Sequence, residues 1–205
     1  MYVVIPVAAE PRNPSLPYAI ASIRKHTTYT PVTVGHDHGI CYHIPAIQTL
    51  GRANIFRNTD NHMRTAIREL GEPFIWSADD IYWLRPAEPI RWAIGDLNHA
   101  TGNTVYTQRK RHTAATLHAL GYPQWDYEAH VPMLVDPEPM LEALALTDAD
   151  PMLDKRSLYG NLTGTPDITA PDVKVRSRRD PLPDASWASS EGTPEKWPAL
   201  MAALT

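Results

Sequence analysis

The sequence has 205 residues, and its 19 Lys and Arg against 23 Asp and Glu give a formal net charge of −4. A hydrophobic fraction of 43% is ordinary for a globular protein, so the composition excludes intrinsic disorder and collagen-like repeats, and the length suits one α/β domain. The longest apolar runs are too short to cross a membrane, and no secretory leader pattern is present, so we expect a cytoplasmic protein without a membrane partner. Cys41 is the single cysteine, which excludes an internal disulfide and a zinc ribbon.

The first 35 residues predict a strand, a helix and a second strand. Residues 2–7 are a β-branched run typical of a buried strand, and residues 16–26 place apolar side chains on one helix face. Residues 31–35 form another β-branched run that ends at a glycine. Strand, helix and strand in this order normally make a right-handed crossover between parallel strands, which predicts an α/β fold.

Further elements continue the alternation. Asn58 to Asp60 offer caps for a helix that ends at Gly71, and residues 72–76 predict a strand. Strands are expected at 91–95 and 131–135, and helices at 107–120 and 137–146. From Thr147 the sequence turns polar and rich in turn residues. We therefore expect a core over 1–146 and a Pro-rich, irregular extension over 147–205 packed on the same domain, with a last helix near 196–204.

Asp79 and Asp80 are the leading candidates for chemistry. They lie between the apolar runs 74–76 and 81–84, where uncompensated charges would be costly. Ligands of open α/β sheets bind beyond the carboxyl ends of strands, which is where this pair is predicted to lie. Adjacent carboxylates there can share a hard divalent cation that also holds a diphosphate. The alternative is an ordinary turn with Asx-type hydrogen bonds.

The order and spacing of several segments resemble the small nucleotide-diphospho-sugar transferases with the glycosyltransferase A-type fold, particularly those of bacteriophages. The segments that carry this resemblance are Val3 to Val7, Asn13, Tyr18 to Arg24, Val32 to Gly35, Asn58 with Thr59, and Phe74 to Pro86. Much of the first 135 residues is covered. The resemblance implies a single-domain, Rossmann-like mixed sheet flanked by helices.

The resemblance also implies site residues. Asp79 and Asp80 would stand for the acidic signature that binds Mn²⁺ or Mg²⁺ and the sugar nucleotide, although Ala78 replaces the commoner Asn or Asp. The other residues expected to bind the donor are Pro6, Val7, Arg12, Asn13, Asp37, Asn58 and Lys174. His130 would be a third metal ligand or a contact of the diphosphate.

An inverting transferase needs a general base for the acceptor hydroxyl. Glu128 and Asp126 are close in sequence to His130, and Asp96 follows Gly95. We take Glu128 and Asp96 as the catalytic candidates, with Asp126 as a neighbouring carboxylate. The sequence does not decide among them.

Two basic clusters are candidates for phosphate contacts. Arg109, Lys110 and Arg111 fall early in a predicted helix, where cations oppose the macrodipole and a nearby anion would offset the cost. Lys174, Arg176, Arg178 and Arg179 alternate with apolar residues in part, as on a strand with one cationic face. The resemblance makes a hydroxylated base of phage DNA one acceptor, with Arg109 to Arg111 on its phosphates; a virion protein or a saccharide is equally compatible.

The sequence therefore favours a metal-dependent transferase that moves a sugar from a nucleoside diphosphate to a hydroxyl acceptor, in the host cytoplasm if a phage encodes it. A non-catalytic nucleotide or nucleic-acid binding module is the alternative. A zinc hydrolase built on His36, His38, Cys41 and His43 is a third reading, but the spacing matches no standard zinc motif.

Overall fold

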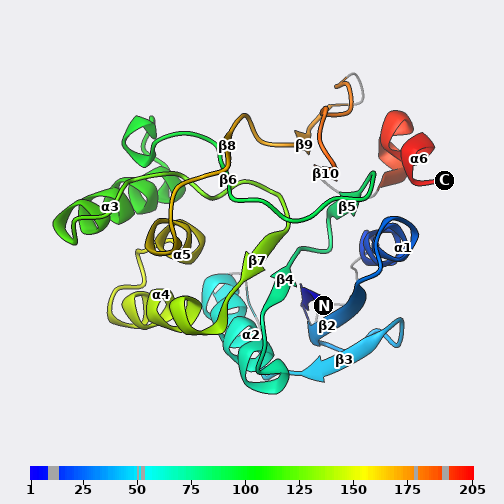
Figure 1. Ribbon diagram of the computed structural model, residues 1–205, viewed down its shortest axis with the longest axis horizontal. Helices are drawn as coiled ribbons and strands as arrows, with labels where there is room; N and C mark the ends of the chain where they lie inside the picture. Colours follow the sequence, from blue (N-terminus) through cyan, green and yellow to red (C-terminus); the bar gives the residue numbers. More distant parts are fainter. Residues whose placement is uncertain (9–13, 50, 52–53, 178–179, 191–193) are drawn as a thin grey trace. The chain divides into compact units, whose positions relative to one another are not determined.

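The apolar run at the start of the chain forms the middle strand of a mixed sheet in the computed structural model. Within the residues that the structure describes (1–8, 14–49, 51, 54–177, 180–190 and 194–205), this sheet has five strands in the order β3-β2-β1-β4-β7 (Figure 1). β1 (Tyr2–Val7), β2 (Thr30–Gly35), β3 (Tyr42–Pro45) and β4 (Phe74–Trp76) are parallel, and β7 (Met133–Val135) is antiparallel to β4. The predicted α/β class with helices flanking a mixed sheet is confirmed.

Two helices connect the parallel strands. α1 (Leu16–His26) has a proline in its first turn and three basic residues in its last turn, as the helix dipole favours. α2 (Ile55–Leu70) ends at Gly71, whose φ of 67° is the left-handed conformation that glycine adopts most readily. α1 connects β1 to β2, whereas α2 connects β3 to β4 and so crosses the sheet in the opposite direction. Right-handed connections therefore place α1 and α2 on opposite faces of the sheet.

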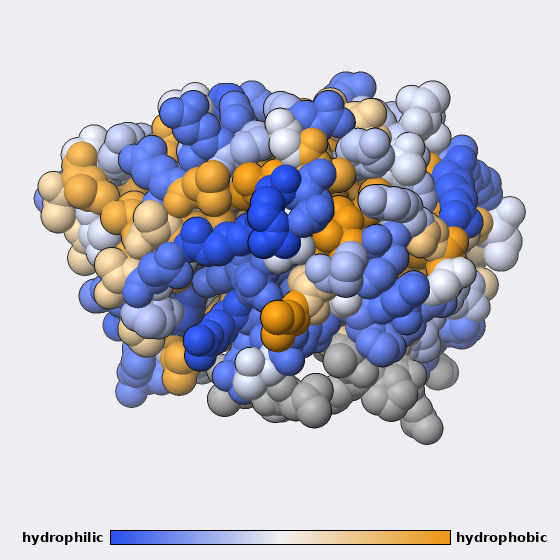
Figure 2. All heavy atoms as spheres, turned by 90° about the horizontal axis from the view of Figure 1, so that it is seen from below, coloured by the Kyte–Doolittle hydropathy of each residue, from blue (hydrophilic) through white to orange (hydrophobic). Residues whose placement is uncertain are grey.

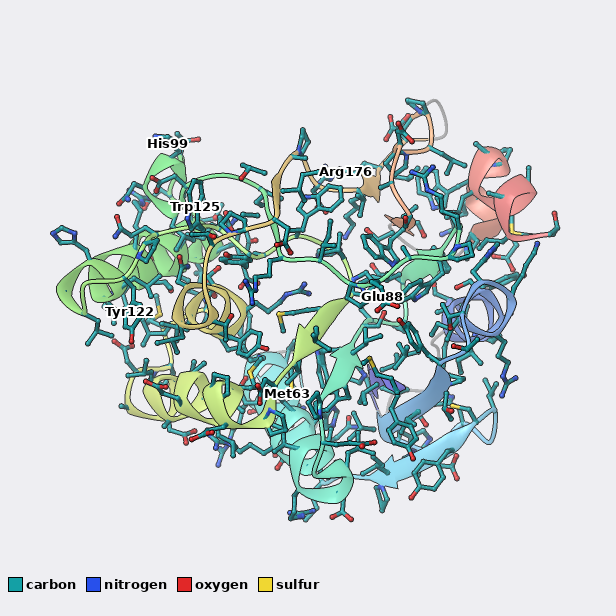
Figure 3. All side chains as sticks on the ribbon, viewed as in Figure 1. Met63, Glu88, His99, Tyr122, Trp125 and Arg176 are labelled. Atoms are coloured by element: carbon teal, nitrogen blue, oxygen red, sulfur yellow. The ribbon has the colours of Figure 1, made fainter. Side chains whose placement is uncertain are left out.

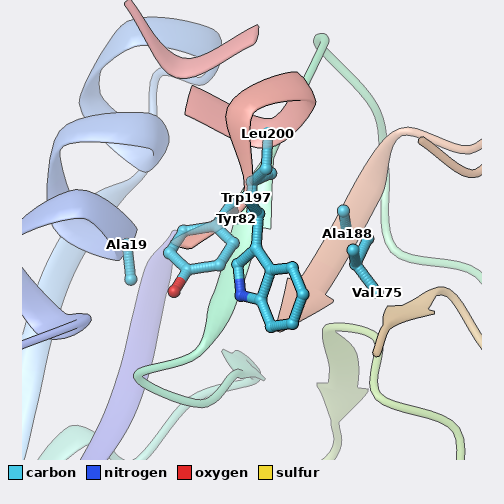
Figure 4. Packing of buried hydrophobic residues seen from close by; sticks show 6 residues of the cluster. All are labelled: Ala19, Tyr82, Val175, Ala188, Trp197 and Leu200. Atoms are coloured by element: carbon cyan, nitrogen blue, oxygen red, sulfur yellow. The ribbon is translucent and has the colours of Figure 1, made fainter. Parts of the chain in front are cut away.

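A second sheet joins the middle of the chain to its end. β5 (Ile81–Trp83), β10 (Trp187–Ser190) and β9 (Lys174–Val175) pair in the order β5-β10-β9. The 3-10 turn Pro194–Lys196 and α6 (Pro198–Leu204) follow. Trp197 and Leu200 pack with Tyr82, and the cluster extends to Ala19 on α1 and to Val175 and Ala188 (Figure 4). The predicted last helix is confirmed.

The chain divides into two compact units. Unit 1 comprises 1–89, 130–135 and 173–205 and holds both sheets described above. Unit 2 comprises 90–129 and 136–172. It contains the paired strands β6 (Trp92–Ala93) and β8 (Ile168–Thr169), the 3-10 turn Leu97–His99, α3 (Val105–Ala119), α4 (Pro137–Ala149) and α5 (Lys155–Thr163).

Three expectations need correction. The strand expected at 91–95 is only two residues long, Trp92–Ala93, because its partner β8 is equally short and Ile94 and Gly95 bond to the backbone of Asp126 instead. The extension from Thr147 is not irregular throughout, since it contains α5, β8, β9 and β10. The expected boundary at residue 146 also falls inside α4, and the compact units are interleaved along the sequence instead.

The missed helix α5 has a local reason. Gly160 and Asn161 are poor helix formers, so the segment carries little intrinsic signal. A side chain at Gly160 would collide with the Tyr127 ring, and Asn161 bonds to the backbone of Trp125 (labelled in Figure 3). Tertiary packing within unit 2 therefore selects this helix.

No helix within the described residues is long and apolar enough to cross a membrane. On the face drawn in Figure 2, hydrophobic side chains lie in separate areas between hydrophilic ones.

Candidate functional site

The carboxyl ends of β1, β2 and β4 meet at one edge of the large sheet. The crossover through α1 leads from β1 to one side, whereas the crossover through α2 leads to β4 on the other side, so the strand order reverses between β1 and β4. A crevice at such a reversal is the usual ligand site of an open α/β sheet. Ser77 to Asp80 follow β4 directly at this edge. The predicted position of the two aspartates is therefore confirmed.

The Asp79–Asp80 turn is held by backbone hydrogen bonds on both sides. The Ser77 amide donates to the carbonyl of Val4 at 2.9 Å, and the Ile81 amide closes the turn on the carbonyl of Ala78 at 3.3 Å. Burial, followed by repulsion from Asp80, raises the pKa of Asp79 to about 6. The turn thus holds negative charge where solvation is poor.

His130 lies beside this turn, just before β7. Its Nδ1 is 3.9 Å from Oδ2 of Asp80, so the structure brings these two predicted ligands together. No three His, Cys, Asp or Glu side chains within the described residues form a group that could hold a metal ion. Asp79, Asp80 and His130 are therefore neighbours but not a complete ligand set.

Gln48 and His62 are residues at this edge that the sequence analysis missed. The Gln48 Nε2 donates to the carbonyl of Val7 at 2.6 Å, and His62 on α2 is buried. Gly35 ends β2 with a φ of 113°, and a Cβ there would meet Gln48, His62 and the Val7 carbonyl. Glycine is required for this close approach. The glycine that ends the second predicted strand was the one available signal.

The predicted nucleoside contacts lie in several places. Pro6 and Val7 end β1 at the edge, and Asp37 follows β2, where its Oδ1 accepts a hydrogen bond from the Gly39 amide at 2.7 Å. Asn58 on α2 instead uses its side-chain amide on both backbone groups of Thr49. Arg12 and Asn13 lie outside the described residues.

Lys174 belongs to β9, opposite Ser189 of β10. Two strand spacings separate β9 from β5, which is about 10 Å. Lys174 is half-buried. The structure therefore places this predicted cation in the same small sheet that continues the Asp79–Asp80 turn. Arg176, labelled in Figure 3, directly follows β9 and is exposed, while Arg178 and Arg179 lie outside the described residues.

The catalytic candidates both lie in unit 2. Asp96 caps the 3-10 turn Leu97–His99, accepting hydrogen bonds from the amide and side chain of Asn98. Glu128 Oε1 accepts from the amide of Ser157 at 3.2 Å, near the start of α5. Burial, and then the charge of Asp154, raise the pKa of Glu128. Asp126 is occupied by Lys110.

The predicted phosphate-binding cluster on α3 needs correction. Arg109 is 7% exposed and pairs with Asp154 at 2.8 Å, and Lys110 is 6% exposed and pairs with Asp126. Their charges are already compensated inside unit 2, so neither side chain is presented to an external phosphate. Arg111 alone among the three is exposed, and its guanidinium donates to the carbonyl of Gly102.

The histidines that follow β2 make separate contacts. The rings of His36 and His38 meet edge to face with centroids 5.1 Å apart, whereas His43 Nδ1 lies 3.3 Å from the Thr33 hydroxyl. Burial raises the pKa of the Cys41 thiol.

A cavity of about 560 Å³ shares no residue with the aspartate turn. It is lined by Lys25, His26, Thr27, Thr28, Tyr29, Pro86, Ala87 and Glu88, where α1 ends and β2 is about to begin. Parallel strands begin at the edge opposite to their carboxyl ends, so this cavity lies at the other edge of the sheet from the candidate site.

No protein-family model matches the sequence, and no curated protein matches it closely enough to count as a relative.

Proposed function

We propose that the chain transfers a sugar from a nucleoside diphosphate to a hydroxyl acceptor, with the donor bound by unit 1. The observation that carries this proposal is the position of Asp79 and Asp80 at the carboxyl end of β4, beside the reversal of strand order. Nucleotides bind open α/β sheets at such reversals. The mixed sheet is compatible with the glycosyltransferase A-type fold that the resemblance of residues 74–86 implies.

The aspartate turn fits a hard divalent cation, Mn²⁺ or Mg²⁺. Burial and the charge of Asp80 raise the pKa of Asp79 to about 6, so a cation would relieve a repulsion that already exists. Such ions favour one or two carboxylates together with phosphate oxygens and water, so a large protein ligand set is not required. Asp80 and Asp79 would hold the ion, with His130 as a neighbour of Asp80. The ion would neutralise charge on the leaving diphosphate.

Other residues of unit 1 would bind the rest of the donor. Pro6 and Val7 would support the nucleoside, and Asp37 offers a carboxylate close to the same edge. Lys174 adds a positive charge suited to the diphosphate. Asn58 is assigned a structural role instead, because its amide is used by the Thr49 backbone.

We assign the general base to Glu128 in preference to Asp96. A base works best when its pKa lies near the working pH, and burial moves the pKa of Glu128 upwards. Asp96 is committed to capping the turn that starts at Leu97.

DNA has less support as the acceptor than the sequence suggested. Two of the three α3 cations are neutralised by Asp126 and Asp154, which removes the main argument for phosphate contacts there. A saccharide or a protein hydroxyl needs no such cluster. Mass spectrometry of DNA and virion proteins made with and without the chain would identify the product.

The donor reaction is tested with purified protein, Mn²⁺ and a panel of sugar nucleotides. A transferase without acceptor should slowly release nucleoside diphosphate from one of them. Asp80→Asn should abolish this release, and Asp184→Asn, which changes an exposed carboxylate, should retain it. Nucleotide binding without hydrolysis would indicate the non-catalytic module, and no binding at all would refute the proposal.

A further inference from the structure

The end of the chain holds one side of the aspartate turn. β10 pairs antiparallel with β5, so that Ser189 lies opposite Ile81 and Ala188 opposite Tyr82. At the end of this ladder the Ser190 amide donates to the carbonyl of Asp80 at 3.3 Å. Residue 80 therefore has its backbone fixed by a residue 110 positions later in the chain.

The side chain of Ser190 makes a second contact, with Tyr82 on β5. Its Oγ lies 3.3 Å from the hydroxyl of Tyr82, and both residues are buried. Burial raises the pKa of Tyr82 to about 12, so this hydroxyl keeps its proton at physiological pH. Ser190 thus bonds to the backbone of Asp80 and to the side chain of Tyr82, two residues further along.

The C-terminal segment that carries Ser190 is itself anchored to α1. Trp197 and Leu200 pack in the cluster with Tyr82 and Ala19 (Figure 4). The Lys25 ammonium donates to the carbonyl of Leu204 at 3.3 Å, and the Tyr18 hydroxyl bonds to Glu195. These contacts hold residues 195–204 against α1.

We propose that Ser190 is a positioning residue for the two-carboxylate turn, acting through the Tyr82 hydroxyl and the Asp80 backbone. This inference rests on the proposed function, because the turn matters only if it binds a divalent cation with a nucleoside diphosphate. Ser190 touches neither ligand in this role. It fixes where Asp80 stands, and the affinity for the cation depends on that position.

The test measures Mn²⁺ binding in the presence of saturating uridine diphosphate, from the loss of the free Mn²⁺ signal in electron paramagnetic resonance. Ser190→Ala and Tyr82→Phe each remove one side of the hydroxyl contact. Each should weaken Mn²⁺ binding by about fivefold, the effect of one hydrogen bond of ordinary strength. Tyr82→Phe also removes a side-chain hydrogen bond with Ser15. The double variant should therefore be no weaker than Tyr82→Phe alone, because that variant already removes the contact with Ser190.

Ser189→Ala is the matched control. Ser189 is the neighbouring residue on β10 and is fully buried, and within the described residues its Oγ has no hydrogen-bond partner. Removing that hydroxyl should leave Mn²⁺ binding unchanged. A loss of Mn²⁺ affinity with Ser189→Ala equal to that with Ser190→Ala would mean that the strand is merely sensitive to substitution, which overturns the inference.

Hydrogen exchange without ligand separates this inference from the proposed function. The amides of Ile81 and Tyr82 should exchange faster in Ser190→Ala and Tyr82→Phe than in the wild type and in Ser189→Ala. Normal Mn²⁺ binding in both variants overturns the positioning role and leaves the proposed function standing. If the wild type binds no Mn²⁺ with the nucleotide, the proposed function fails, and hydrogen exchange alone tests the positioning of the turn. Exchange at Ile81 and Tyr82 that is as slow in Ser190→Ala and Tyr82→Phe as in the wild type then overturns that positioning, and faster exchange supports it.

Discussion

Asp79 and Asp80 are adjacent in sequence but differ in their surroundings. Asp79 carries the cost of burial next to a like charge, whereas Asp80 lies 3.9 Å from a His130 nitrogen and has its carbonyl bonded by Ser190. The two carboxylates should therefore contribute differently to binding and to stability.

Asp80→Asn keeps the size of the side chain but removes its charge. We expect Mn²⁺ and uridine diphosphate together to raise the melting temperature of the wild type more than either does alone, because ligands that bind only the native state stabilise it by mass action. In Asp80→Asn this joint effect should be lost while the fold survives. Thermal unfolding with and without both ligands measures it. A joint stabilisation of normal size in the variant would contradict the assignment.

Asp79→Asn should stabilise the protein above pH 6. The native pKa of about 6 exceeds the ordinary value of 3.8, so the native state binds more protons than the unfolded state between these pH values. Wild-type stability therefore falls as pH rises from about 4 to about 6, by at most about 3 kcal/mol. Asparagine does not ionise, so the free energy of unfolding of the variant should exceed that of the wild type by up to this amount above pH 6 and by little below pH 4.

Urea unfolding of Asp79→Asn and wild type at pH 4 and pH 7.5 tests this sign. Asp184→Asn serves as the control, since its carboxylate is exposed and its pair with Arg85 should contribute little. An Asp79→Asn variant that is less stable than wild type at pH 7.5 would show that the carboxylate is favourably placed without a cation.

At the scale of single elements, α3 is a structural helix that resembles a binding helix in sequence. Arg109, Lys110 and Arg111 are consecutive, but their side chains have different surroundings because a helix turns about 100° per residue. Arg109 and Lys110 face Asp154 and Asp126, which are 45 and 16 residues away in the chain. Local sequence could not show these partners, whereas it did predict the helix and its approximate ends.

Arg109→Met should destabilise the protein by about 3–5 kcal/mol, because it leaves the buried carboxylate of Asp154 without its cation. Arg111→Met is the matched control on the same helix, and it should change the free energy of unfolding by less than about 1 kcal/mol because that side chain is exposed. Urea denaturation of both variants gives the comparison. Equal stabilities would mean that the Arg109 pair contributes nothing.

The same control variant also tests DNA as an acceptor. A salt-dependent loss of duplex DNA binding in Arg111→Met would support DNA as the acceptor again.

At the scale of the whole molecule, the sequence predicted the α/β order and the location of the aspartate turn. Those features depend on local periodicity and on a simple rule about strand ends, and both can be read from the sequence. The interleaving of the two units cannot be read in this way, because segments such as 130–135 and 173–205 return to unit 1 through long-range pairing. Gln48 and His62 were missed for the same reason: only the fold brings them to Gly35.

The division into units predicts where the donor acts. The proposed donor ligands Asp79, Asp80 and Lys174 all belong to unit 1, while α3, α4 and α5 belong to unit 2. Binding slows hydrogen exchange most where it suppresses local opening. We therefore expect Mn²⁺ with uridine diphosphate to protect the segments 2–7 and 74–83 and to leave the amides of α3 unchanged. Asp80→Asn should remove this protection. Protection of α3 with no change at 74–83 would move the nucleotide site to unit 2 and refute the donor assignment.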